Sequence, residues 1–211
     1  MKARKILAMV AALALTAALA VGGTLAYLTS QATVTNTFSV GAVAITMDET
    51  DIDDSTAGAE RDTDNTYSNL MPGHKYVKDP IVHVDADSES SWIFVEVKNG
   101  LSAFEADTST VTGSEYTKIA GQITGHGWTA LDGVANVYYQ SYTKGQADKD
   151  LEVFDEFKIS GTANDVNGWS EITTTNTDTQ IVVNAYAVQA DGFTTASDAW
   201  TATFGAPPTQ G

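Results

Sequence analysis

The sequence contains no cysteine, four prolines and three histidines among its 211 residues. Without cysteine the chain cannot form disulfide bonds, so a folded domain must be stabilised by its hydrophobic core alone. Basic residues are also scarce, with 11 Lys and Arg against 27 Asp and Glu. The resulting net charge of −16 argues against nucleic-acid binding and favours divalent cations and basic partners.

Long apolar runs are missing too, apart from one of 16 residues between Ile6 and Val21. This run is shorter than the roughly 20 residues that a membrane-spanning helix needs. It follows a basic N-terminus, and Gly22-Gly23 interrupts it where a span would continue. The pattern is typical of a secretory signal peptide, with an uncleaved anchor helix as the alternative.

A cleavage site follows this run. Thr24 and Ala26 supply small side chains at positions −3 and −1, so we predict a signal peptide of residues 1–26 and a mature chain beginning at Tyr27. Removing 26 of 211 residues leaves 185, which is enough for one sizeable domain. Three cations leave with the signal, so 8 basic against 27 acidic residues give the mature chain a net charge of −19. Contact with a membrane is expected only before processing.

The mature sequence is rich in β-branched and aromatic residues, which favour strands. Nearly continuous apolar runs predict long strands at 91–98 and 181–190, the first of them central in its sheet. Shorter strands are expected at 43–47, 76–85, 135–140 and 151–159, and a helical turn at 196–200. Pro80 places a sheet edge or a bulge in the second of these, and Pro72-Gly73 predicts a turn. Residues 101–127 show no clear pattern.

These elements predict an all-β fold, specifically a jelly-roll-like β-sandwich with long loops over residues 41–205 and a disordered tail at 206–211. Large apolar side chains on the strands indicate its interior. We expect six of them to lie together inside one sandwich: Trp92, Phe94, Tyr138, Phe154, Val183 and Tyr186.

An acidic stretch with few large apolar residues covers 48–69 and reads as a long exposed loop. Its carboxylates provide a weak candidate site for Ca²⁺, which takes six to eight oxygen ligands. The spacing does not match the loop of an EF-hand, so a solvated loop is the favoured interpretation. The candidate ligands are Asp51, Asp53, Asp62 and Asp64.

Catalytic signatures are absent from the sequence. The three histidines, His74, His83 and His126, do not form an H-E-x-x-H motif. His83 and Asp85 would share one face of a strand near His74, and a zinc site there is conceivable. Exposed polar residues are the favoured interpretation, and no cysteine nucleophile or phosphate-binding loop is present. We predict that the protein has no catalytic residues and is not an enzyme.

Four blocks, taken in their order, resemble the TasA/camelysin family of exported Gram-positive proteins, which includes fibre-forming subunits of the biofilm matrix. They are Gly22–Tyr27, Asn36–Gly41, Asn69–Gly73, and a late block with Trp128, Tyr138-Tyr139, Gly145, Leu151, Ala185–Phe193 and Ala199-Trp200. The resemblance implies a jelly-roll domain, a signal end handled by a dedicated SipW-type signal peptidase, and secretion to the matrix or cell surface. In some members the freed N-terminal segment completes the sheet of the next subunit, a process called donor-strand exchange.

Residues 27–40 have the composition of such a donor, with Tyr27, Leu28, Val34 and Thr35 as its candidate residues. A sandwich that lacks one strand exposes unpaired backbone groups and an apolar groove, which an added strand can fill. The alternative is that 34–47 forms the first strand of its own domain.

The leading hypothesis is therefore a secreted structural protein that self-associates into extracellular fibres. Its partners would be further copies of itself, other matrix proteins and the signal peptidase, with no nucleic acid. Two alternatives remain: a secreted metallopeptidase, since camelysin-like relatives have been classed as such, and a monomeric surface adhesin.

Overall fold

The computed structural model of the chain describes residues 29–32, 43–53, 60–172 and 176–205. The predicted signal peptide and the predicted tail at 206–211 lie outside the described residues. Among the helices that are described, none has the length and apolar character that a membrane span requires.

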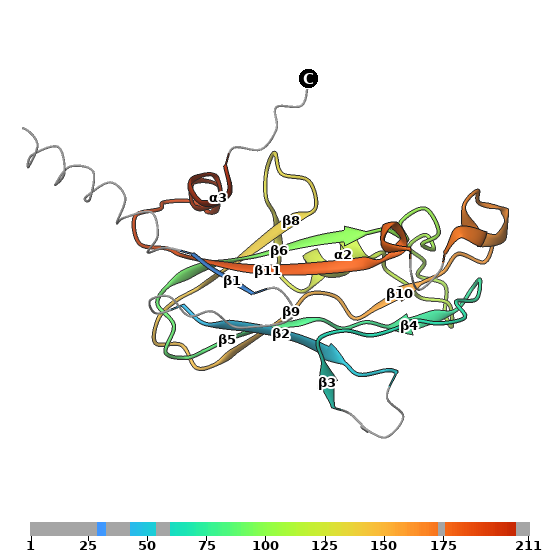
Figure 1. The fold of residues 1–211 in the computed structure, drawn as a ribbon, viewed down its shortest axis with the longest axis horizontal. Coiled ribbons are helices and arrows are strands. Elements are labelled where there is room, and N and C mark those ends of the chain that lie inside the picture. Colours follow the sequence, from blue (N-terminus) through green and yellow to red (C-terminus); the bar gives the residue numbers. More distant parts are fainter. Residues whose placement is uncertain (1–28, 33–42, 54–59, 173–175, 206–211) are drawn as a thin grey trace, which may run out of the picture.

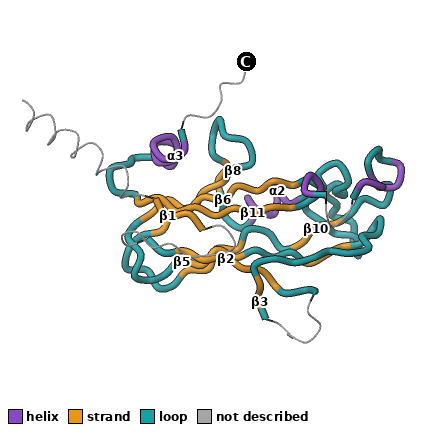
Figure 2. Tube along the Cα trace, viewed as in Figure 1, coloured by secondary structure: helices purple, strands orange, loops and turns teal. Residues whose placement is uncertain are grey.

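Two antiparallel layers of strands lie face to face (Figures 1 and 2). The upper layer in Figure 1 is a five-stranded sheet, in spatial order β1 (Thr29–Ala32), β11 (Ile181–Gln189), β6 (Ser91–Asn99), β8 (Val137–Tyr142) and β7 (Thr129–Ala130). The lower layer holds a four-stranded sheet, in the order β3 (Arg61–Asp62), β2 (Ile45–Thr50), β5 (Ile81–Val84) and β9 (Lys149–Glu152). A third ladder joins β10 (Glu156–Lys158) to β4 (Lys75–Val77). The all-β prediction is confirmed, because strands make up most of the regular secondary structure of the described residues.

Three of these pairings belong to one long two-stranded ribbon. The ladder runs from Lys75↔Lys158 through Ile81↔Glu152 to Ser91↔Tyr142, and each step forward on one arm matches one step back on the other. The bends of the two arms also touch, since the Ala86 amide donates to Asp148 at 2.8 Å. The ribbon therefore keeps a single register while it passes from the lower layer to the upper one.

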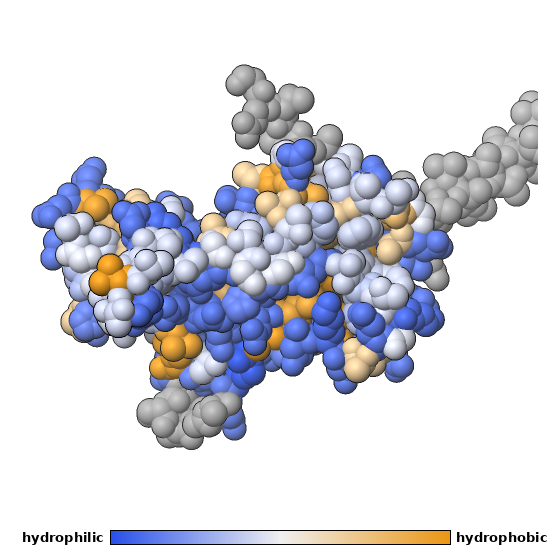
Figure 3. Space-filling view, turned by 180° about the vertical axis from the view of Figure 1, so that it is seen from behind, coloured by the Kyte–Doolittle hydropathy of each residue, from blue (hydrophilic) through white to orange (hydrophobic). Residues whose placement is uncertain are grey.

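Helices are short and lie at the periphery. They are α2 (Ile119–Gly125), α3 (Ala196–Phe204) and the 3₁₀ turns η1 (Ala163–Asp165), η2 (Trp169–Glu171) and η3 (Thr177–Thr179). Thr195 caps α3 by accepting a hydrogen bond from the Asp198 amide at 3.1 Å. Figure 1 places α3 on the outer side of the five-stranded sheet. The surface in Figure 3 is mostly hydrophilic, with apolar residues in small separate patches.

The six residues expected in one core are divided between two clusters. Phe154 and Val183 are buried between the two layers, and Tyr138 packs against them. Phe94 is fully buried on the other side of the five-stranded sheet, where Trp92 and Tyr186 pack beside it beneath α3. The difference from the single predicted core arises because residues alternate faces along β6 and β11, and because α3 covers the outer face.

The strand predictions are confirmed for β6 and β11, and β6 is the middle strand of its sheet. Residues 151–159 were expected to form one strand but form parts of two, β9 and β10. The strand predicted over 76–85 is interrupted at Pro80, which lies between β4 and β5. β5 itself lies inside its sheet, so the edge that Pro80 offered as one alternative is not found there. The Pro72-Gly73 turn is present: Gly73 has φ of 82° and the His74 amide donates to Met71 at 3.2 Å.

Candidate functional site

Within the part of the chain that the structure describes, the β11 edge of the five-stranded sheet is only partly paired. β1 runs antiparallel to β11, from Thr29↔Val188 to Ala32↔Ala185. Among the described residues, the four that precede Ala185 on β11, Ile181 to Asn184, have no ladder partner on this side. Unpaired edge groups of this kind can accept a further strand.

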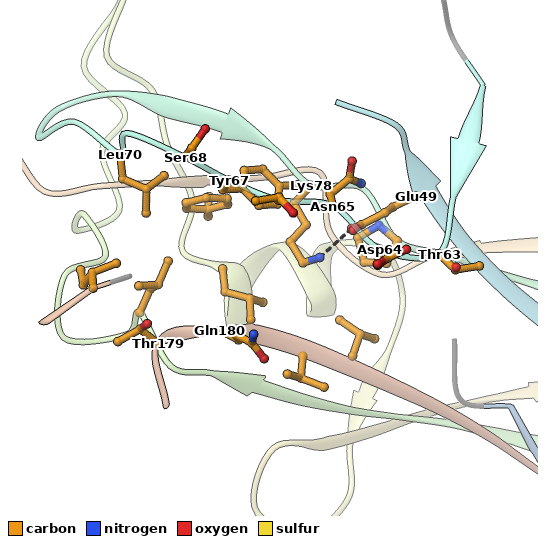
Figure 4. Close-up of a pocket in the computed structure, with 18 of the residues that line it drawn as sticks. Glu49, Thr63, Asp64, Asn65, Tyr67, Ser68, Leu70, Lys78, Thr179 and Gln180 are labelled. Atoms are coloured by element: carbon orange, nitrogen blue, oxygen red, sulfur yellow. Dashed lines mark hydrogen bonds and ion pairs between the residues drawn. The ribbon is translucent and has the colours of Figure 1, made fainter. Parts of the chain in front are cut away.

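A cavity of about 830 Å³ lies beside this unpaired half of β11. Its walls come from β2, from the loop between Thr63 and Leu70, and from β11 with the residues just before it. Tyr67 and Leu70 lie on one side, and Thr179 and Gln180 on the opposite side (Figure 4). Apolar side chains, including Phe157, contribute to the lining, so the cavity suits a segment with alternating apolar residues.

A buried ion pair stands in the wall of this cavity. Lys78 Nζ donates to Glu49 Oε2 at 2.6 Å, and the two side chains are 11% and 8% exposed. The Lys78 ammonium also lies 5.9 Å from the centre of the Tyr67 ring. Burial, reinforced by the negative charge of Glu49, raises the pKa of Tyr67 well above its usual value, so its hydroxyl stays protonated and donates to Val77.

A charged network links β2 to the neighbouring strands. Arg61 contacts the carboxylates of Asp48 and Asp79. Burial opposes ionisation of Asp79, but hydrogen bonds from Thr50 and Arg61 outweigh it and lower the pKa of this carboxyl. His83 lies between Asp150, at 2.6 Å from Nδ1, and Asp48, at 3.1 Å from Nε2. The network therefore holds in place the part of β2 at which the acidic stretch begins.

The four candidate calcium ligands serve mostly as local hydrogen-bond acceptors. Asp51 accepts from the Asp53 amide at 3.1 Å, Asp53 from the Thr66 amide at 2.6 Å, and Asp62 from the Thr63 amide at 2.6 Å. Asp64 lines the cavity. Among the described residues, which leave out 54–59, these four aspartates do not form a compact group of three possible metal ligands.

A compact group of this kind lies elsewhere. The candidate ligand atoms of His126, Glu152 and Asp155 are all within 4.8 Å of one another. His126 was the histidine to which sequence analysis assigned no role, while His83 contacts Asp48 and Asp150 rather than Asp85. The spacing Glu152-x-x-Asp155 was the available sequence signal, but nothing linked it to a histidine 26 residues earlier.

The predicted processing and donor residues lie outside the described residues: Thr24, Ala26, Tyr27, Leu28, Val34 and Thr35. β1 lies between the two halves of this set. The structure thus describes the middle of the predicted donor segment and places its backbone at the edge of β11.

Comparison with known proteins gives one family. The model of the family described as camelysin metallo-endopeptidase matches residues 2–62. No curated protein and no solved structure shows significant similarity to the chain. The matched residues include the predicted signal peptide, β1, β2 and the start of the acidic loop, and over them the chain is similar to that family.

Proposed function

We propose that the protein is an exported structural subunit that assembles into extracellular fibres by strand addition. Residues 27–37 of one subunit would take the place of β1 on β11 of the next subunit and continue along Ile181–Asn184. The observation that carries this proposal is that Ile181–Asn184, beside the cavity, has no ladder partner on this side among residues 29–32, 43–53, 60–172 and 176–205. Main-chain hydrogen bonds would supply much of the affinity, and alternate side chains would set the register.

The register of β1 supports the assignment of a donor residue. Extending the pairs Thr29↔Val188 and Ala32↔Ala185 by two residues brings Val34 opposite Val183. Directly opposed residues share one face of a sheet. Val183 is 7% exposed and belongs to the core between the layers, so Val34 would point into the cavity.

Chain length favours filling the cavity from another subunit. The Ala44 amide donates to the Ser88 hydroxyl. Two residues later, the Ser90 carbonyl accepts from the Ala190 amide, just beyond the end of β11. A strand that continued to Ile181 in its own subunit would have to return along β11 to Ala44. The return would run back along most of β11, and only the seven residues 37–43 would be available for it, in a nearly fully extended conformation. A strand from a neighbouring subunit needs no return.

Two further features agree with this proposal. The signal-like N-terminus lies inside the segment that matches the family, which supports export and processing after Ala26. The ribbon shared by both layers is the connectivity expected of a jelly roll, a double-sheet fold that leaves edges for pairing. We therefore assign the chain to the extracellular space of a Gram-positive bacterium.

The test compares processed protein beginning at Tyr27 with a truncated form beginning at Phe38. The processed form should sediment as fibres, while the truncated form should fold but stay soluble, because it keeps the cavity and loses the donor. A peptide of residues 27–37 should bind the truncated form and raise its unfolding temperature by mass action. Fibres from the truncated form, or none from either, would contradict strand addition.

A matched pair of variants tests the register. Val34→Asp places a charge opposite Val183 and should abolish sedimentation, whereas Thr35→Asp faces the other side of the strand and should leave most of it. Equal effects of both variants would indicate a different pairing. Chelator-sensitive hydrolysis of casein by soluble protein would instead favour the metallopeptidase alternative.

A further inference from the structure

His126 lies between two carboxylates on the surface of the domain. Its Nδ1 is 3.3 Å from Glu152 Oε2, and its Nε2 is 3.1 Å from Asp155 Oδ1. The histidine side chain is 23% exposed, while Glu152 and Asp155 are 59% and 61% exposed. The imidazole is therefore held in place, and both carboxylates can rotate.

Buried hydrogen bonds fix the backbone that carries these three side chains. Gln122, one helical turn before His126, accepts from the Asp155 and Glu156 amides at 2.9 and 3.2 Å and donates to the Glu156 carbonyl. The buried Trp128 indole donates to the Glu152 carbonyl at 2.7 Å. The end of α2 and the β9–β10 connection are thus joined from both sides, which preorganises the three ligands.

Glu152 and Asp155 share a single basic partner among the described residues, because the ion pairs of both end on His126. The comparable histidine, His83, faces Asp48 and Asp150, but Asp48 is already paired with Arg61. The His126 cluster therefore places two carboxylates around one imidazole and attracts a divalent cation in a chain of net charge −16.

We infer that His126, Glu152 and Asp155 form a binding site for a divalent transition-metal ion such as Zn²⁺. One imidazole nitrogen and two carboxylate oxygens suit zinc, which they bind at about 2.0–2.2 Å. Ligand atoms now within 4.8 Å need to approach to about 3.4 Å for tetrahedral coordination, which the exposed carboxylates can do by rotation. The second ring nitrogen would then hydrogen-bond to water.

The inferred site goes beyond fibre assembly, because none of its ligands belongs to β11, to the cavity lining or to residues 27–37. Water would complete the coordination sphere. A bound ion would clamp α2 to the β9–β10 connection and raise the resistance of the domain to unfolding.

The test is calorimetric titration of the untagged, chelator-treated protein with zinc chloride at neutral pH. One ion should bind per chain, and His126→Ala, Glu152→Gln and Asp155→Asn should each weaken binding by about tenfold or more. His83→Gln is the matched control, since it removes a histidine that also lies between two aspartates, and it should leave the affinity unchanged. Circular dichroism confirms that each variant is folded.

Three outcomes would overturn the inference. They are no zinc binding by the folded wild-type protein, the same affinity in all three ligand variants as in the wild type, and a loss of binding in His83→Gln. A calcium titration separates this site from the acidic loop, because an all-oxygen loop site would bind Ca²⁺ in the His126→Ala variant as well as in the wild type.

Discussion

At the scale of single residues, Glu49 and Lys78 form an ion pair with little access to water. Removing one partner leaves the other charge buried, which costs about 3 kcal/mol or more. We expect Lys78→Met to lower the free energy of unfolding by that amount, and the double variant with Glu49→Leu to recover most of it. Urea unfolding measures both changes.

The exposed pair between Lys75 and Glu156 is the control for that measurement, with side chains 41% and 30% exposed. Its disruption by Lys75→Met should cost less than about 1 kcal/mol, since solvent screens such pairs. Similar losses at the two positions would mean that water hydrates the Glu49 pair through the cavity.

His83 predicts a pH-dependent contribution to stability. Burial lowers its pKa, but hydrogen bonds and charges from Asp48 and Asp150 outweigh burial, so the pKa is raised above 6.5. The stabilisation is then fully present below pH 6.5 and is lost as the pH rises through the raised value. The difference in unfolding free energy between wild type and His83→Gln should therefore shrink across this range. A difference that is independent of pH would refute the assignment.

At the scale of elements, α3 closes the outer face of the five-stranded sheet. Phe94 is fully buried there, and its ring centre lies 5.2 Å from that of Trp200. Truncation to Phe94→Ala should cost roughly 3–5 kcal/mol, as for other buried aromatic residues. Val111→Ala, at a position 66% exposed, should change stability by less than about 0.5 kcal/mol. An unchanged thermal midpoint for Phe94→Ala would mean that α3 does not cover this face.

Elements with continuous apolar runs were the ones that the sequence predicted well. β6 and β11 agree with their predicted spans to within a residue at each end. α2 was missed because Ile119–Gly125 contains two glycines and a threonine, which are poor helix formers; packing of Ile119 and Ile123 against the core stabilises it instead. The His126 cluster and the Glu49–Lys78 pair were also missed, because each joins residues that only the sheet topology brings together.

At the scale of the whole molecule, net charge opposes association. The mature chain would carry 8 basic and 27 acidic residues, so subunits repel one another at low ionic strength. Fibre formation should therefore be faster in about 0.15 M salt, where the Debye length is about 8 Å, than in about 0.01 M salt, where it is about 30 Å. Sedimentation over time measures the rate. A rate that falls with added salt would show that attraction between charges drives assembly.

The long ribbon also bears on how fast the domain can fold. Its nearest paired residues, Glu96 and Val137, are already far apart in sequence, and Lys75 and Lys158 are farther still. Closing such loops costs entropy before any contact repays it, so proteins of this topology fold in milliseconds to seconds. The shortest loop closes first, so pairing should begin at β6–β8 and proceed outward to β4–β10. During that interval the chain exposes strands that other chains can pair with, and the order of closure decides which edge remains open longest.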